Sequence, residues 1–176
     1  MHPDTLTPPQ KWFDRQFTFG QHAAMLPIYL ERLEGTIYRI EARVKGVSEA
    51  VLSHQPEGKW SIKQHIGHLG EMDALSDRRV DEMIQGVSTI TPGSFDGGNY
   101  HRQPIADVLH FFQDSRRKHL AHYQSLSDDD LARTSLHPRL RLRMGPVDMA
   151  MFDADHDDHH LVIIHEILKS IDPKTD

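Results

Sequence analysis

The sequence predicts an all-α protein, a four-helix bundle with long loops, and three observations lead to this prediction. Apolar residues recur at steps of three and four in four separate stretches, which is the spacing of one buried helix face. Residues that begin or end helices, such as serine, proline and glycine, bound these stretches. Little of the remaining chain alternates between apolar and polar residues as β-strands do. Four amphipathic helices bury their apolar faces most simply against one another.

The first two predicted helices have clear ends. The first should begin near Met25 and end at Gly46. The second should begin at Ser61, because Ser61 and Gln64 have the spacing of a capping box, and it should stop at Gly86.

The second half of the chain should contain the other two helices and the longest connections. Residues 87–103 are rich in glycine and proline and predict a long loop, either a plain connector or a functional lid. The third helix should begin with Pro104 in its first turn. Residues 136–143 alternate leucine and arginine, which indicates an extended segment or a weak hairpin. The fourth helix should then run from Pro146 to about Ser170.

Length and composition limit the class of protein. The 176 residues fit one domain, and we expect residues 1–24 to form an N-terminal arm with a short helical turn and residues 25–176 to form the bundle. No apolar run approaches the roughly 18 residues that cross a bilayer. The first residues lack the basic start and apolar core of a signal peptide, so we expect a cytoplasmic protein that does not bind membranes.

Charge and cysteine content limit the chemistry. The net charge of −6 argues against binding nucleic acid through phosphate contacts. Because the chain has no cysteine, any metal must be bound by histidine, aspartate, glutamate or water. The 14 histidines are the one unusual feature of the composition.

Two histidines lie on the apolar face of the last predicted helix. This face contains Met149, Phe152, His156, His160, Ile163 or Ile164, Ile167 and Ile171. Because His156 and His160 are one turn apart, they can bind one shared metal ion, each at about 2.0–2.1 Å. The alternative is that both are hydrogen-bonded residues of the core.

A third ligand could come from the inner face of the second helix, where spacing favours His68 and leaves His65 open. Three histidines leave a fourth position for water, as in catalytic sites. Four aspartates flank the histidine pair, namely Asp153, Asp155, Asp157 and Asp158. They either orient the ligands by hydrogen bonds or, as we expect for at least three of them, form a solvated acidic face.

Two further residues of the second helix are candidate catalytic groups. Glu71 lies one turn after His68 and is a candidate general base, and Asp73 is the alternative. It is equally plausible that either residue is only a charged residue of the surface. Arg79 lies further along the same stripe. If it is buried, it needs a carboxylate or an anionic substrate, and otherwise its charged end reaches solvent.

Three segments together resemble a known family. The segments KWSIKQHIGHL, LHPRLRLRMGPVDM and FDADHDDHHLVII are similar to those of the DinB/YfiT-like superfamily of metalloenzymes, closest to the branch with the bacillithiol S-transferases. The resemblance covers residues 30–171. It implies a bundle with an up-down-down-up course and a divalent metal, nickel or zinc, bound by His68, His156 and His160. Arg79 lies where that branch carries an arginine.

The resemblance also implies an activity. It points to a metal-dependent enzyme, a homodimer, that acts on a small-molecule substrate as a thiol S-transferase with a low-molecular-weight thiol, or as a hydrolase. One alternative is a non-catalytic, stress-related protein that binds metal or a small ligand. The other is a scaffold protein whose histidines are only polar residues of the core. The chain departs from some relatives at Asp155 and Ile163, which alters the expected pocket wall. We expect substrate to enter over the helix ends, between residues 87–103 and 136–143. Arg141 or Arg143 is available there for an anionic thiol, but we favour the alternative that both belong to a solvated basic strand.

Overall fold

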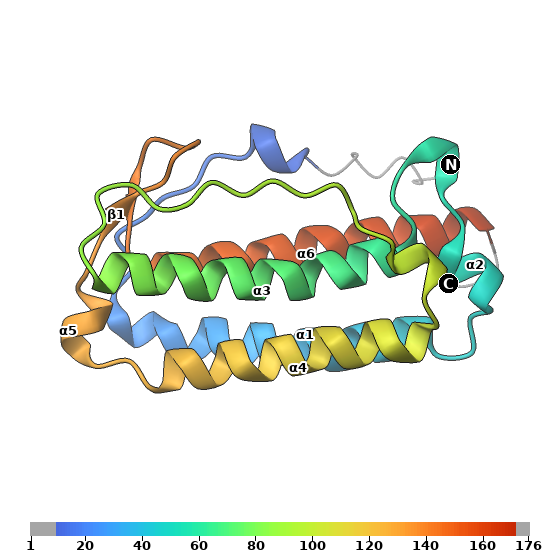
Figure 1. Cartoon of the computed structure of the whole chain (residues 1–176), viewed down its shortest axis with the longest axis horizontal. Helices are drawn as coiled ribbons and strands as arrows, with labels where there is room; N and C mark the ends of the chain where they lie inside the picture. The colour runs from blue at the N-terminus through green and yellow to red at the C-terminus, as the bar shows by residue number, and fades with distance from the viewer. Residues whose placement is uncertain (1–9, 172–176) are drawn as a thin grey trace, which may run out of the picture.

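The computed structural model describes residues 10–171 and shows a bundle of four long helices (Figure 1). These are α1 (Leu26–Val44), α3 (Ile62–Ile84), α4 (Ile105–Gln124) and α6 (Pro146–Ile171). The shorter elements are η1 (Trp12–Asp14), η2 (Ala23–Met25), α2 (Glu49–Ser53), η3 (Pro56–Gly58), η4 (Tyr100–Arg102), α5 (Asp128–Leu131), β1 (Ser135–Leu136) and β2 (Arg143–Met144). The all-α fold class predicted from the sequence is confirmed. No helix in the described part of the chain is both long and apolar enough to span a membrane.

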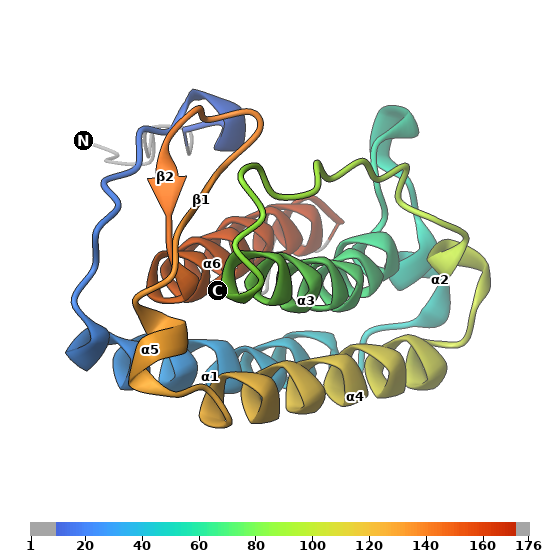
Figure 2. The same ribbon diagram turned by 60° about the vertical axis from the view of Figure 1, so that its left-hand side comes forward.

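The four helices follow an up-down-down-up course. The colour gradient in Figure 1 shows that α1 and α6 run in one direction and α3 and α4 in the other. Helix α3 packs against α4 and α6, and α1 packs against the same two helices. Because α3 and α4 are parallel, the chain between them must travel the length of the bundle, roughly 35 Å for a helix of the length of α3. The long loop does this along the outside of α3 (Figure 2).

Local signals set the helix ends as the sequence predicts. Ser61 Oγ accepts a hydrogen bond from the backbone N–H of Gln64 at 3.2 Å, and Gln64 Oε1 accepts one from the backbone N–H of Ser61 at 3.0 Å. This pair is a complete capping box at the start of α3. Gly46 and Gly86 follow α1 and α3 with φ values of +77° and +76°, which glycine adopts without strain.

The predicted extended segment forms a short hairpin beside α6. Ser135 pairs with Met144, and Leu136 with Arg143, in an antiparallel register. An isolated bridge also joins Thr89 to Leu136. The long loop and the hairpin are therefore tied together, and both lie on the side of the bundle formed by α3 and α6 (Figure 2).

The core has two apolar clusters with a charged layer between them. One cluster lies near the end of α3 and the start of α6 and includes Val80, Met83, Met149 and Phe152. The other lies near the start of α3 and the end of α6 and includes Ile66, Leu69, Phe112 and Ile164. The buried charged residues between them, in the order of the chain, are Asp73, Arg116, His119, Asp153 and Asp157.

Arg116 is the centre of the charged layer. Its side chain is 1% exposed, and its guanidinium donates hydrogen bonds to both Asp73 and Asp157 and to the Leu33 carbonyl. A buried charge is tolerated when it is paired and hydrogen-bonded in this way. The layer therefore joins α1, α3, α4 and α6 through one side chain.

His119 is the second cation of this layer. Its Nδ1 lies 2.6 Å from Asp77 Oδ1, and its Nε2 lies 3.6 Å from Asp153 Oδ2. Burial alone would lower the pKa of His119, but the carboxylates of Asp153, Asp77 and Asp73 outweigh it and raise the pKa to about 10.

The charged layer corrects one expectation about the aspartates near the histidine pair. Asp153 and Asp157 are buried, so the expectation that at least three of the four aspartates are solvated was wrong. Asp155 and Asp158 lie nearer the surface, where both bind Arg32. No described aspartate among the four hydrogen-bonds to a histidine of the pair.

Candidate metal centre

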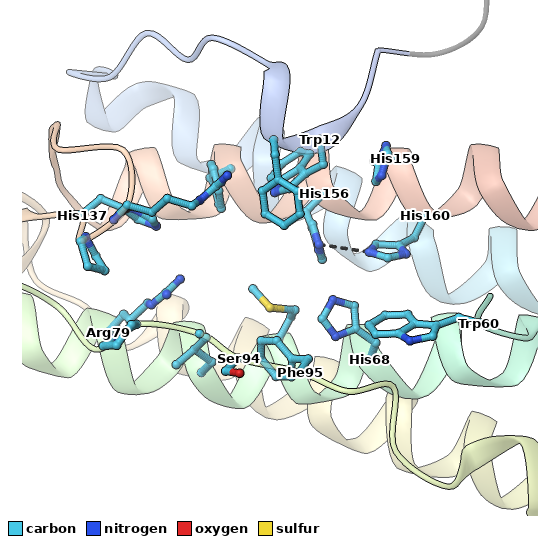
Figure 3. Close-up of a pocket in the computed structure, with 18 residues that line it drawn as sticks. Trp12, Trp60, His68, Arg79, Ser94, Phe95, His137, His156, His159 and His160 are labelled. Atoms are coloured by element: carbon cyan, nitrogen blue, oxygen red, sulfur yellow. Dashed lines mark hydrogen bonds between the residues drawn. The ribbon is translucent and has the colours of Figure 1, made fainter. Parts of the chain in front are cut away.

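The structure brings His68, His156 and His160 together. His68 comes from α3, and the other two come from the adjacent, antiparallel α6. One nitrogen of each ring lies within 4.8 Å of the others, and all three residues are buried. The Nε2 atoms of His156 and His160 are 3.1 Å apart (Figure 3). These three residues, here called the histidine triad, are the set that the family resemblance implies as metal ligands.

The triad fits a divalent ion on two counts, the spacing of its nitrogens and the charge state of its rings. Two nitrogens 3.1 Å apart, each about 2.05 Å from one ion, subtend an angle of about 98°, which is close to tetrahedral. Burial lowers the pKa of His68 to about 4, and it lowers the pKa of His156 and His160 well below the usual value. All three rings are therefore neutral near pH 7, as metal ligands must be.

His65, the competing ligand in the sequence, has a different position. Its Nδ1 lies 2.8 Å from Nδ1 of His160. It therefore contacts the side of the His160 ring that faces away from His156. Partners in this position fix the tautomer of a ligand histidine.

The triad lies in the wall of a cavity of about 710 Å³. Trp12 packs against His156 with ring centroids 4.8 Å apart, and Trp60 packs against His68 at 4.9 Å. Phe95 from the long loop also contacts His68. Trp12 and Phe95 could not be assigned to the site from the sequence, because neither lies on a helical stripe with the histidines. No aspartate or glutamate lines the described cavity.

The cavity lies along the side of the bundle, where residues from the middle of α3 and α6 line it, and the expected entrance over the helix ends stays a prediction. The long loop contributes residues 92–95 to its wall, and the hairpin contributes residues 137–139. Both segments were predicted to border the site. The N-terminal segment adds Trp12 and Phe13. Asp155, which was expected to alter the pocket wall, is not part of the lining and binds Arg32 instead.

Glu71 lies behind His68 rather than in the cavity. Its Oε1 accepts a hydrogen bond from Tyr100 Oη at 3.0 Å, and its Oε2 lies 3.9 Å from His68 Nδ1. Burial raises the pKa of Glu71. The alternative base, Asp73, is bound to Arg116 in the charged layer. The role of general base for Glu71 stays a prediction, and its position supports orienting His68.

Two arginines line the cavity. Arg79 is 4% exposed and donates from Nε to the Thr91 carbonyl at 2.9 Å, so its charged end does not reach solvent. The arginine that the hairpin contributes is Arg139. Arg141 and Arg143, the two expected from the sequence, are not part of the lining, and Arg143 is bound to Thr134.

Comparisons with known proteins agree with the fold. The sequence profile of the DinB superfamily matches residues 32–164. No curated protein matched the sequence. Among solved structures, the fold is similar to YfiT from Bacillus subtilis, described as a probable metal-dependent hydrolase with an unusual four-helix bundle topology. The TM-score is 0.75 at 16% identity, over 89% of this chain and 93% of that one.

A mycothiol-dependent maleylpyruvate isomerase is also similar, with a TM-score of 0.64 at 12% identity. The match covers 78% of this chain and 59% of the isomerase. At these identities the likeness concerns the fold. Together with the superfamily match, it confirms the resemblance drawn from the three segments.

Proposed function

The chain belongs to the DinB superfamily, and on that premise we propose that it is a metal-dependent enzyme acting on a small molecule. His68, His156 and His160 would hold one divalent ion, zinc or nickel. One observation carries the proposal: three neutral imidazoles converge in the wall of a large cavity, so an ion held there has an open side. Three-histidine sites with an open position are typical of catalytic metal centres.

We propose thiol S-transfer as the reaction, with a low-molecular-weight thiol as co-substrate. A divalent ion at this site would supply Lewis acidity that lowers the pKa of a thiol or a water molecule. In the transfer, the thiol loses its proton to solvent, its sulfur bonds to carbon, and the carbon releases its leaving group with the bonding electrons. Trp12, Trp60 and Phe95 would form apolar walls beside the reacting atoms.

The lining of the cavity favours a thiol over water as the nucleophile. Among the described residues, no carboxylate faces the cavity to take a proton from water. A thiol, with an ordinary pKa of about 8.5, gives up its proton far more easily. Hydrolysis is the alternative reaction. In either case we propose that Glu71 orients His68 from behind.

Metal analysis of the purified, untagged protein tests the site. The wild type should carry close to one zinc or nickel ion per chain, and His160→Ala should lose it. His165→Ala is a matched control, because His165 lies on α6 but is exposed and outside the triad. Absence of metal from the wild type, even after zinc and nickel are supplied, would refute the proposed centre.

Turnover is tested on the metal-loaded protein. A small thiol with an activated aryl halide or epoxide should give the thioether, and activated esters and amides test the hydrolytic alternative. Bound metal without turnover of any of these would instead support a non-catalytic, stress-related metal- or ligand-binding protein.

Other expectations from the sequence and from the resemblance also stay proposals. We propose a cytoplasmic homodimer that does not bind nucleic acid, which the net charge of −6 supports. We also propose residues 1–24 as an arm and residues 25–176 as the bundle domain. Light scattering would test the dimer.

A further inference from the structure

The cavity has a second polar end, away from the histidine triad. Arg79 of α3 and two hairpin residues, His137 and Arg139, line it. Figure 3 shows Arg79 and His137 together at one end of the cavity, with His68 and His160 at the other. These three residues, here called the basic end, all offer hydrogen-bond donors.

Arg79 is a buried cation that has no counter-ion among the described residues. Its Nε is bound to the Thr91 carbonyl, and no carboxylate oxygen of the described residues lies within 4.0 Å of its guanidinium. The negative charges of Asp153 and Glu82 act on it only from farther away, and burial lowers the pKa of Arg79. A desolvated guanidinium that lacks a paired anion is unfavourable unless a ligand provides one.

His137 adds a neutral donor. Its Nδ1 accepts hydrogen bonds from the backbone N–H groups of Arg139, at 3.3 Å, and Leu140, at 3.1 Å. The proton of the neutral ring therefore lies on Nε2. Burial lowers the pKa of His137 to about 4, and the charges of Arg79 and Arg139 add to this effect, so the ring is neutral near pH 7.

Arg139 is held by stacking rather than by an ion pair. Its guanidinium carbon lies 4.4 Å from the ring centroid of Phe13, which belongs to the N-terminal segment. Stacking on an aromatic face leaves the edge of a guanidinium free to bind an oxyanion. Neither Arg139 nor Arg79 forms an ion pair with a described residue.

We propose that the basic end is an anion subsite that binds a carboxylate or phosphate group of the substrate or co-substrate. The paired N–H groups of an arginine guanidinium match the paired oxygens of a carboxylate or a phosphate, and the Nε2–H of His137 is a further hydrogen-bond donor. The subsite would hold the anionic end of a molecule whose reacting atom lies at the histidine triad. This second part rests on the proposed metal-dependent function, whereas anion binding itself does not.

Anion binding can be measured on the full chain after metal has been removed with a chelator. Phosphate and succinate are the probes, and succinamide is the uncharged control. We expect saturable binding of at least one of the two anions by calorimetry, and none of succinamide. Tighter phosphate binding would identify a phosphate-bearing ligand, and tighter succinate binding a carboxylate.

Variants locate the binding. Arg79→Met and Arg139→Met should each weaken anion binding at least tenfold. Arg143→Met is the matched control, because Arg143 lies on the same hairpin outside the cavity and should leave binding unchanged. If Arg79→Met does not fold, Arg139→Met still tests the subsite. Arg139 packs on a surface aromatic ring, so its replacement should not prevent folding.

Two results would overturn the subsite: no saturable anion binding by the wild type, or unchanged binding by a folded Arg139→Met variant. Because the titrations use metal-free protein, they do not depend on the metal centre. Failure of the proposed function would appear separately, as absent metal in the analysis of wild type and His160→Ala.

Discussion

Replacing His65 by leucine should weaken metal binding by roughly ten- to a hundredfold. In the proposed centre the Nε2 atoms of His156 and His160 both face the ion, so neither of these atoms carries a proton. The proton of neutral His160 must then lie on Nδ1, from which it is donated to His65 Nδ1 across 2.8 Å. His65 in turn must carry its own proton on Nε2.

The size of the effect follows from comparing the metal-bound and metal-free forms of the variant. Without His65, the loaded protein keeps a buried His160 Nδ1–H without an acceptor, which costs about 1–3 kcal/mol. The metal-free protein avoids this cost, because His160 can carry its proton on Nε2 instead and donate to His156 Nε2 at 3.1 Å. The penalty therefore falls on metal binding, and about 1–3 kcal/mol corresponds to roughly 5- to 150-fold in Kd.

A competition titration of zinc against a chromophoric chelator measures this Kd. His65→Asn, which keeps an acceptor near the Nδ1 position, should recover part of the loss. His165→Leu, on the exposed side of α6, should bind like the wild type. A His65→Leu variant with a Kd within twofold of the wild-type value would show that the contact does not set the tautomer of His160.

Three further predictions concern the bundle. Arg116→Met should lower the free energy of unfolding in urea by about 3–5 kcal/mol, because two buried carboxylates lose their counter-charge, whereas the exposed Arg117→Met should cost less than about 0.5 kcal/mol. The pKa of His119 is raised from 6.5 to about 10 on folding, so its stabilisation is complete below pH 6.5 and is lost as the pH rises through 10. The difference in unfolding free energy between wild type and His119→Gln should therefore shrink over that range, and a constant difference would contradict this. Gly67→Ala should lower the Tm and reduce the free energy of unfolding by about 1–3 kcal/mol, because the added Cβ would lie 2.4 Å from the Tyr100 ring. An unchanged Tm would show that the Tyr100 ring moves aside freely.

The helix ends and the histidine pair could be predicted because they depend on residues close together in the sequence. The Ser61–Gln64 box needs only three residues of separation, and His156 and His160 share a face wherever α6 is helical. The choice between His68 and His65 depends on how α3 meets α6. Spacing along one helix does not contain this information, and only the family resemblance supplied it.

The charged layer could not be predicted, because its members come from different helices. Arg116 on α4 pairs with Asp73, 43 residues earlier, and with Asp157, 41 residues later. In the sequence, Asp153 and Asp157 belong to an acidic run, and charged residues are mostly exposed. Their burial becomes visible only once Arg116 and His119 are seen opposite them.

The order of the helices explains why the cavity lies on the side of the bundle. Parallel α3 and α4 require a connection along the whole bundle, and this connection forms one wall. The hairpin that precedes α6 forms another wall and is joined to the first by the Thr89–Leu136 bridge. The packed helices therefore fix the histidine triad, whereas loops carry His137, Arg139 and Phe95. Because loops change more readily than packed helices, a change in the hairpin alone would alter the His137 and Arg139 part of the proposed anion subsite without disturbing the proposed metal position, while Arg79 on α3 would stay in place.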